Sequence, residues 1–142
     1  HLSIRRQRQM CIRDSINLAH LYLGKLYYKQ NNRKAAATEF EIVTKNTKTA
    51  VGAEAKYYLA QILFDEAQYL PAQQACFDLS NQVPSYEYWV AKGFILLADT
   101  YHKLGNDFQA KSTLQSIIDE YEGTDDIVTE AKSKLESFLI SK

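Results

Sequence analysis

The sequence predicts an all-α protein built from consecutive antiparallel helix pairs. Only 5 glycines and 2 prolines occur among 142 residues, which disfavours a turn-rich β fold. Apolar residues recur three and four positions apart, as on one face of a helix. Small residues return at intervals of 36 and then 38 residues, first as Gly24, Ala60 and Ala98 and again as Ala36, Ala72 and Ala110. We therefore expect one helix pair for each interval.

Seven helices follow from the apolar pattern, over residues 16–30, 33–46, 51–66, 70–82, 86–104, 107–121 and 125–140. Gly105, and Asn31 or Asn32, suit a left-handed helix end. Pro71 suits the first turn of the helix that it opens. The small residues at fixed spacing predict close helix crossings, with larger side chains filling the space between them.

The last predicted helix has the pattern of a terminal helix. Thr124, Asp125 and Asp126 suit a helix start, where carboxylates and hydroxyls satisfy free N–H groups. We expect Ile127, Ala131, Leu135 and Phe138 to be buried, while Lys132, Lys134 and Glu136 point elsewhere. Such a helix covers one end of a helical array.

Residues 1–15 differ from the rest of the chain. They carry Arg5, Arg6, Arg8 and Arg13 against Asp14, a charge of +3, so residues 16–142 carry −3 because the total is zero. No apolar helix face continues from this stretch, and "RQRQMCIRDS" is similar to a translated adapter or cloning sequence. We predict that residues 1–15 are non-native or disordered and that residues 16–142 form a single domain.

Composition argues against several function classes. Basic residues beyond the leader are dispersed among acids, which disfavours nucleic-acid binding. The longest apolar run, 94–98, is far shorter than the roughly 18 residues of a membrane span, so no membrane insertion is expected. Cys76 is the one cysteine beyond the leader residue Cys11, and a small buried thiol is the simplest interpretation.

The repeated residues resemble the tetratricopeptide repeat, whose pattern is W-x2-L-G-x2-Y, then A-x3-F, then P. The third copy holds Phe94, Leu97, Ala98, Tyr101, Ala110 and Leu114 in these slots. No copy keeps the Trp, which is replaced by His20, Lys56 and Phe94, and only the second keeps the late proline, Pro84. The resemblance implies a right-handed α-solenoid with repeats over 17–52, 53–90 and 91–122, followed by the terminal helix.

The family resemblance also implies a function, which is to bind a peptide or partner helix in the concave groove lined by the first helix of each repeat. Matching the family's groove positions to this sequence gives as candidates Lys25, Tyr28, Lys29, Tyr57, Gln61, Phe64, Asp65, Lys92, Asp99, His102 and Lys103. Aromatic residues among mixed charges suit protein recognition. Tyr57 and Phe64 have a second interpretation, as packing between neighbouring repeats.

More specific sites are weakly supported. Of the family's clamp for a chaperone's terminal carboxylate, only Lys92 matches, because the other slots hold Leu21, Lys25, Tyr58 and Leu96. Asp99 and His102 lie three apart and could share a metal, but a third ligand is missing. No phosphate-binding loop, nucleophile motif or catalytic carboxylate pair is found, so we expect no cofactor, no metal and no enzyme activity.

Two alternatives remain open beside an interaction scaffold. The segment could be structural, self-associating through its first helix, which starts with no capping residue and bears Leu18, Leu21, Leu23 and Leu26. It could also be the C-terminal part of a longer array. The long repeat and the helix starts at 84–86 and 123–126 are similar to bacterial periplasmic repeat proteins of outer-membrane assembly, which would place the protein in the cell envelope; a cytoplasmic location is the other option.

Overall fold

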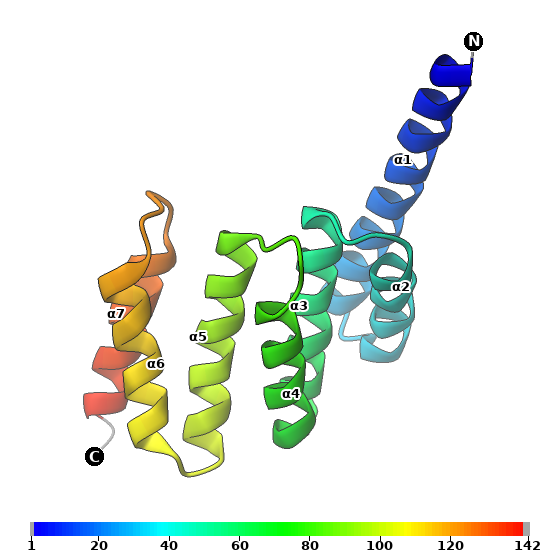
Figure 1. Ribbon diagram of the computed structural model, residues 1–142. Coiled ribbons are helices and arrows are strands. Elements are labelled where there is room, and N and C mark those ends of the chain that lie inside the picture. The colour runs from blue at the N-terminus through cyan, green and yellow to red at the C-terminus, as the bar shows by residue number, and fades with distance from the viewer. Residues whose placement is uncertain (1, 141–142) are drawn as a thin grey trace. The chain divides into compact units, whose positions relative to one another are not determined.

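The computed structural model describes residues 2–140, with side chains from Ser3 onward, and these residues form seven α-helices and no strand (Figure 1). The helices are α1 (Leu2–Lys29), α2 (Arg33–Asn46), α3 (Ala50–Asp65), α4 (Tyr69–Ser80), α5 (Glu87–Lys103), α6 (Asp107–Glu120) and α7 (Ile127–Ile140). The predicted all-α fold is confirmed. The chain divides into two compact units, residues 1–59 and 60–142, with the boundary inside α3.

The first unit is built on the helix pair α1 and α2. Gly24 allows the two helices to approach closely, since a Cβ there would lie 2.7 Å from Cε1 of Phe40. Phe40, Ala36 and Val43 of α2 are fully buried, as is Leu21 of α1. The small residue at this crossing therefore has the role that the spacing predicts.

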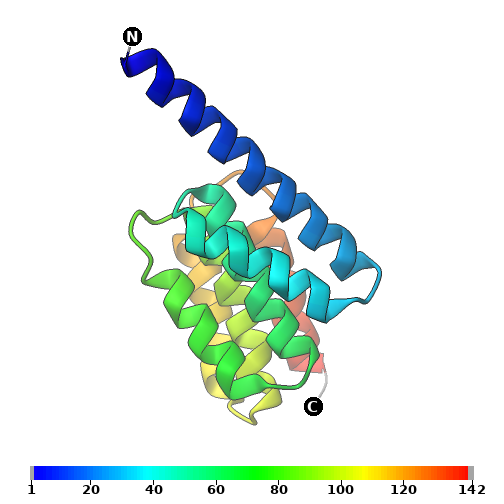
Figure 2. The same ribbon diagram turned by 90° about the vertical axis from the view of Figure 1, so that its right-hand side faces the viewer.

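Helix α1 begins much earlier than predicted, at Leu2 instead of near residue 16. Its first half extends past the end of α2 (Figure 2), and every side chain from Ser3 to Ile16 is exposed. The residues before Asn17 extend α1 toward the N-terminus without tertiary contacts. Their arginine, glutamine and methionine residues favour this extension because they are good helix formers. A non-native origin of residues 1–15 stays a prediction, and so does a single domain over 16–142.

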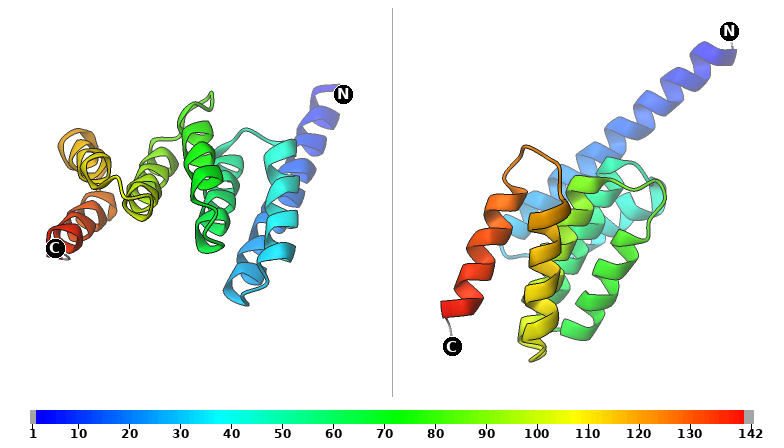
Figure 3. Two further views of the ribbon diagram at one scale, coloured as in Figure 1. Left: turned by 90° about the horizontal axis from the view of Figure 1, so that it is seen from below. Right: turned by 60° about the vertical axis from the view of Figure 1, so that its left-hand side comes forward.

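The second unit contains the end of α3 and helices α4 to α7, with α6 and α7 both beside α5 (Figure 3). Its core joins Ala98 of α5, Ala110 and Leu114 of α6, and Ile127 and Ala131 of α7, all fully buried. Gly93 lets α4 pack close to α5, because a Cβ there would lie 2.9 Å from Cδ2 of Leu79. Large side chains thus fill the space that small residues leave at each crossing.

Three helix turns have the same backbone, and they confirm the repeat most directly. Asn31, Ala67 and Gly105 have φ values of 60°, 61° and 82°, in the left-handed region. After each, a backbone N–H reaches back five residues, from Asn32 to Tyr27, Gln68 to Leu63 and Asn106 to Tyr101, at 2.8–2.9 Å. These are Schellman ends. Their spacing of 36 and 38 residues equals that of the small residues.

The terminal helix differs from the prediction in two respects. It begins at Ile127 rather than 125: the carbonyl of Asp126 accepts the first helical hydrogen bond, from the N–H of Glu130 at 2.9 Å, and Oδ1 of Asp125 accepts one from the N–H of Ile127 at 3.1 Å. Ile127, Ala131 and Phe138 are buried as expected, and Leu135 is half-buried. Lys134 does not point away from the protein, since it donates a hydrogen bond to Asp99 of α5.

Candidate interaction surface

Three of the predicted groove residues of the first unit, Lys25, Tyr28 and Tyr57, lie around one side chain, Tyr58. The rings of Tyr28 and Tyr57 pack edge-on against it, with centroids at 5.7 and 5.5 Å. Phe40 stacks on it almost in parallel, at 5.1 Å. Tyr58 lies outside the predicted groove positions and was missed; its place directly after Tyr57 is the available signal. The aromatic cluster Tyr28, Tyr57, Tyr58 and Phe40 joins the predicted surface to the core.

Lys25 is held beside this cluster by Glu54. Its Nζ donates a hydrogen bond of 2.8 Å to Oε2 of Glu54 and lies 5.8 and 5.9 Å from the ring centroids of Tyr22 and Tyr58. The hydrogen bond to Glu54 raises the pKa of Lys25 against the opposing effect of burial. An ammonium near two ring faces is stabilised by their π electrons. Lys29, one turn further, is exposed.

The predicted residues of the second half of α3 contact each other or α4. Gln61 donates from Nε2 to Oδ1 of Asp65 at 3.0 Å. Phe64 packs edge-on against Tyr69 of α4, with centroids 5.4 Å apart. All four side chains are half-buried. Phe64 therefore packs within its own unit. This agrees with the alternative interpretation of Phe64 as a packing residue.

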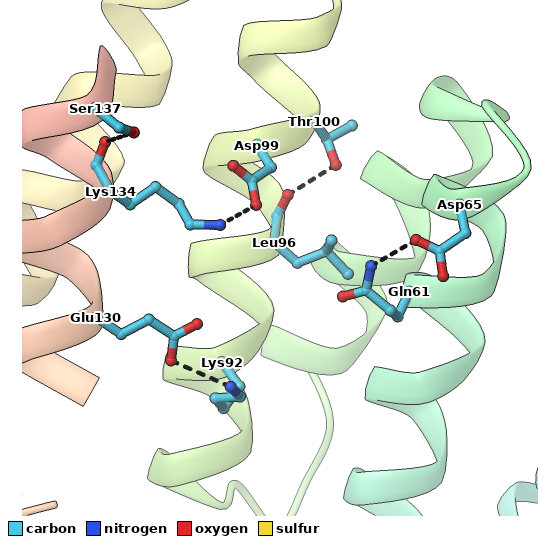
Figure 4. A network of polar contacts seen from close by, with 9 residues as sticks. All are labelled: Gln61, Asp65, Lys92, Leu96, Asp99, Thr100, Glu130, Lys134 and Ser137. Atoms are coloured by element: carbon cyan, nitrogen blue, oxygen red, sulfur yellow. Dashed lines mark hydrogen bonds and ion pairs between the residues drawn. The ribbon is translucent and has the colours of Figure 1, made fainter. Parts of the chain in front are cut away.

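Three of the four predicted residues on α5 lie against α7, as Figure 4 shows for two of them. Lys92 donates to Oε2 of Glu130 at 3.2 Å, and Asp99 accepts from Lys134. His102 stacks on Phe138, with centroids 4.5 Å apart and an interplanar angle of 19°. The fourth residue, Lys103, is exposed. The charges alternate along both helices, so the two ion pairs fix how α7 is aligned on α5.

The structure does not bring Asp99 and His102 together as a metal pair. Nδ1 of His102 lies 2.6 Å from Oδ1 of Asp107, while Asp99 contacts Lys134. Within residues 2–140, no three His, Cys, Asp or Glu side chains are grouped so that they could hold a metal ion. Each member of the pair therefore has a structural partner of its own.

Reactive groups elsewhere are also engaged in packing. Cys76 is 1% exposed, and burial raises the pKa of its thiol to about 12, far from nucleophilic at neutral pH. His20, in the slot of the missing Trp, is half-buried with Nδ1 2.5 Å from Oε2 of Glu39. No helix formed by the described residues has both the length and the apolar character needed to cross a membrane.

A family model described as tetratricopeptide repeat matches residues 18–46 and 94–124. These segments fall on the first and third predicted repeats, so tetratricopeptide-type repeats are detected at both places. The second predicted repeat, 53–90, lies outside the matched segments. A comparison with curated protein sequences gives no match.

Among solved structures, the chain is similar to the N-terminal domain of stress-induced protein-1 (STI-1) from C. elegans. The TM-score is 0.64 at 17% sequence identity, over 87% of this chain and 96% of that one. The likeness shows that both share a helical repeat fold of the tetratricopeptide type. Tetratricopeptide folds in general mediate contacts between proteins.

Proposed function

We propose that the protein is a non-catalytic scaffold that binds a peptide or a partner helix on the first helices of its repeats. The observation that supports this most is the cluster around Tyr58, where Lys25 and Glu54 border half-buried tyrosines. Rigid aromatic side chains with a charged border resemble the energetic centre of many protein interfaces. Partner contacts are proposed for the eleven groove candidates.

The exposed lysines offer the sharpest test, because changing Tyr57 or Phe64 would also remove packing. Lys29 and Lys103 occupy the last turns of α1 and α5 and are exposed. Lys45, in the last turn of α2, and Lys132 on α7 are exposed as well but lie outside the proposed groove. The pair Lys29→Glu/Lys103→Glu can therefore be compared with Lys45→Glu/Lys132→Glu, which changes the charge equally.

The experiment is crosslinking affinity capture from the source cells with the full chain as bait, followed by a Kd for the recovered partner. The groove pair of substitutions should weaken binding at least about fivefold, since each removes a border charge and introduces its opposite. The control pair should leave the Kd unchanged. Equal losses in both pairs, with unchanged melting, would contradict binding on the first helices.

A second candidate function is self-association, as a structural segment of a larger repeat protein. Leu18, Tyr22 and Leu26 recur every four residues on α1 and are 38%, 60% and 51% exposed. A helix face of this kind buries apolar surface when another helix covers it. Sedimentation equilibrium should then show a concentration-dependent mass that Leu18→Ser/Leu26→Ser reduces to the monomer's.

Assignment to the cell envelope rests on the sequence resemblance alone. If the protein belongs to the outer-membrane-assembly type, the gene should encode a secretion signal or lipoprotein motif. Sequencing the complete reading frame tests this directly. A reading frame that encodes neither motif would refute the assignment to the cell envelope.

A further inference from the structure

A hollow of about 530 Å³ lies between the first half of α5 and the second half of α6. Its inner surface is mostly apolar and comes from Val90, Ala91, Phe94, Ile117 and Tyr121. Ala91 and Ile117 belong to the buried core, while Phe94 and Tyr121 are half-buried and remain partly open to solvent. An apolar side chain from outside could thus reach the core surface here.

Phe94 lines the hollow and occupies the slot in which the repeat pattern has Trp. A phenyl ring is smaller than an indole and leaves the space between the helices incompletely filled. The wall on the far side is held in place, since the hydroxyl of Tyr121 donates to Oδ2 of Asp125 at 2.6 Å. Gly123 accommodates that ring: a Cβ there would lie 2.4 Å from Cε1 of Tyr121.

Three carboxylates line the same hollow, Glu87 in the first turn of α5, Glu120 at the end of α6, and Glu122. All three are exposed. Among the described residues, no hydrogen bond or ion pair involves them. No lysine or arginine lines the hollow. Its apolar interior is therefore bordered by uncompensated negative charge.

This surface is separate from the proposed groove. Glu87, Val90 and Phe94 follow one another at helical spacing on one face of α5. Lys92 and Asp99, which contact α7, lie roughly 140–160° around the helix from Phe94, at about 100° per residue. The hollow thus remains accessible whether or not a partner occupies the groove face.

We propose that the hollow is a second docking site, for a basic segment of a partner protein that carries one aliphatic or aromatic anchor. The anchor enters the hollow against Phe94 and Ile117, and lysine or arginine on either side pairs with Glu87, Glu120 and Glu122. An acidic or neutral segment would leave these carboxylates without compensation, so charge selects the partner.

The test uses two fluorescein-labelled synthetic hexapeptides and the full chain. One has Leu-Phe at its centre with two lysines on each side, and the other has glutamates in place of the lysines. By fluorescence anisotropy, the basic peptide should bind with a Kd on the order of 100 μM, since a short flexible peptide loses conformational freedom on binding. The acidic peptide should show no binding.

Phe94→Trp tests the hollow itself by filling it with the residue of the repeat pattern. We expect the basic peptide to bind at least about tenfold more weakly, because its anchor can no longer be buried. Phe108→Trp is the matched control, since Phe108 is 77% exposed on α6 outside the hollow. Equal effects of the two substitutions would overturn the proposal.

Glu87→Gln/Glu120→Gln tests the border without altering the hollow, and should weaken binding about three- to tenfold in low salt. Glu136→Gln, at an exposed position on α7, should have no effect. The proposal is wrong if the basic peptide fails to bind, or if the acidic one binds equally. The groove variant Lys29→Glu/Lys103→Glu should still bind the basic peptide. The peptide assay therefore tests the hollow alone, and its outcome does not depend on whether the groove binds a partner.

Discussion

Replacement of Ala67 by glycine should stabilise the second unit. Ala67 has φ 61° and follows α3 in the same turn that Gly105 provides after α5. A Cβ in the left-handed region is repelled by the following carbonyl, whereas glycine has no such contact. Ala67 is exposed, so loss of its methyl group removes little packing.

The size of the effect follows from two opposing contributions. Relief of the left-handed conformation is worth roughly 1–2 kcal/mol. The greater freedom of glycine in the unfolded chain costs about 0.4–1 kcal/mol. The net gain should lie between about 0 and 1.6 kcal/mol. Its midpoint, about 0.8 kcal/mol, corresponds to a rise in Tm of roughly 2–4 °C. Gly105→Ala should lose a similar amount for purely conformational reasons, since its Cβ would meet nothing within 4 Å.

Urea unfolding followed by circular dichroism measures both variants, with the m value showing whether the same surface unfolds. Ala75→Gly, in the middle of α4, is the control and should lose about 1 kcal/mol. Asn31→Gly should gain only a few tenths of a kcal/mol, because asparagine tolerates this conformation. A loss of stability in Ala67→Gly, at unchanged m, would refute the reasoning.

Three further outcomes are expected. Gly24→Ala should destabilise the first unit by about 1–3 kcal/mol in urea unfolding, because its Cβ collides with Phe40; unchanged stability would contradict the close crossing. Under native conditions a thiol reagent should modify the exposed Cys11 quickly, and the buried Cys76 only as the protein unfolds; equal rates would refute that burial. The hydrogen bond to Asp125 raises the pKa of Tyr121 to about 12. The stability that this hydrogen bond contributes is therefore complete below pH 10, the usual pKa of tyrosine, and is lost as the pH rises through 12. Tyr121→Phe should reduce this alkaline loss, as measured by unfolding at pH 9 and pH 12.

Most of the fold could be predicted because the repeat specifies local geometry. Left-handed ends were expected at Asn31 or Asn32 and at Gly105, and both are found. The equivalent end at Ala67 carried no signal, since alanine rarely adopts positive φ; only its place in the repeat identifies it. The start of α1 was misplaced because an exposed helix without tertiary contacts has no buried face for a pattern to reveal.

The site was less predictable because it depends on pairing between helices. Slots in a repeat give the face on which a residue lies, and Lys25 and Tyr28 of α1 do lie beside the same ring, that of Tyr58; their role in binding stays a prediction. The slots do not give the partner of each side chain. The contacts of Glu54 with Lys25 and of Tyr58 with Tyr28 could not be predicted, because they depend on how closely α1 and α3 approach each other.

Lys134 shows how a terminal helix changes the interpretation of a groove position. It lies three residues after Ala131 and four before Phe138, so the apolar stripe itself places it on the inner face of α7. Its long side chain can reach beyond that stripe and neutralise Asp99, a predicted groove residue, without leaving either charge buried alone. In the last repeat, then, α7 contacts Lys92, Asp99 and His102, so a partner in the proposed groove would meet side chains that are already engaged, and Lys103 is the candidate on α5 that stays exposed.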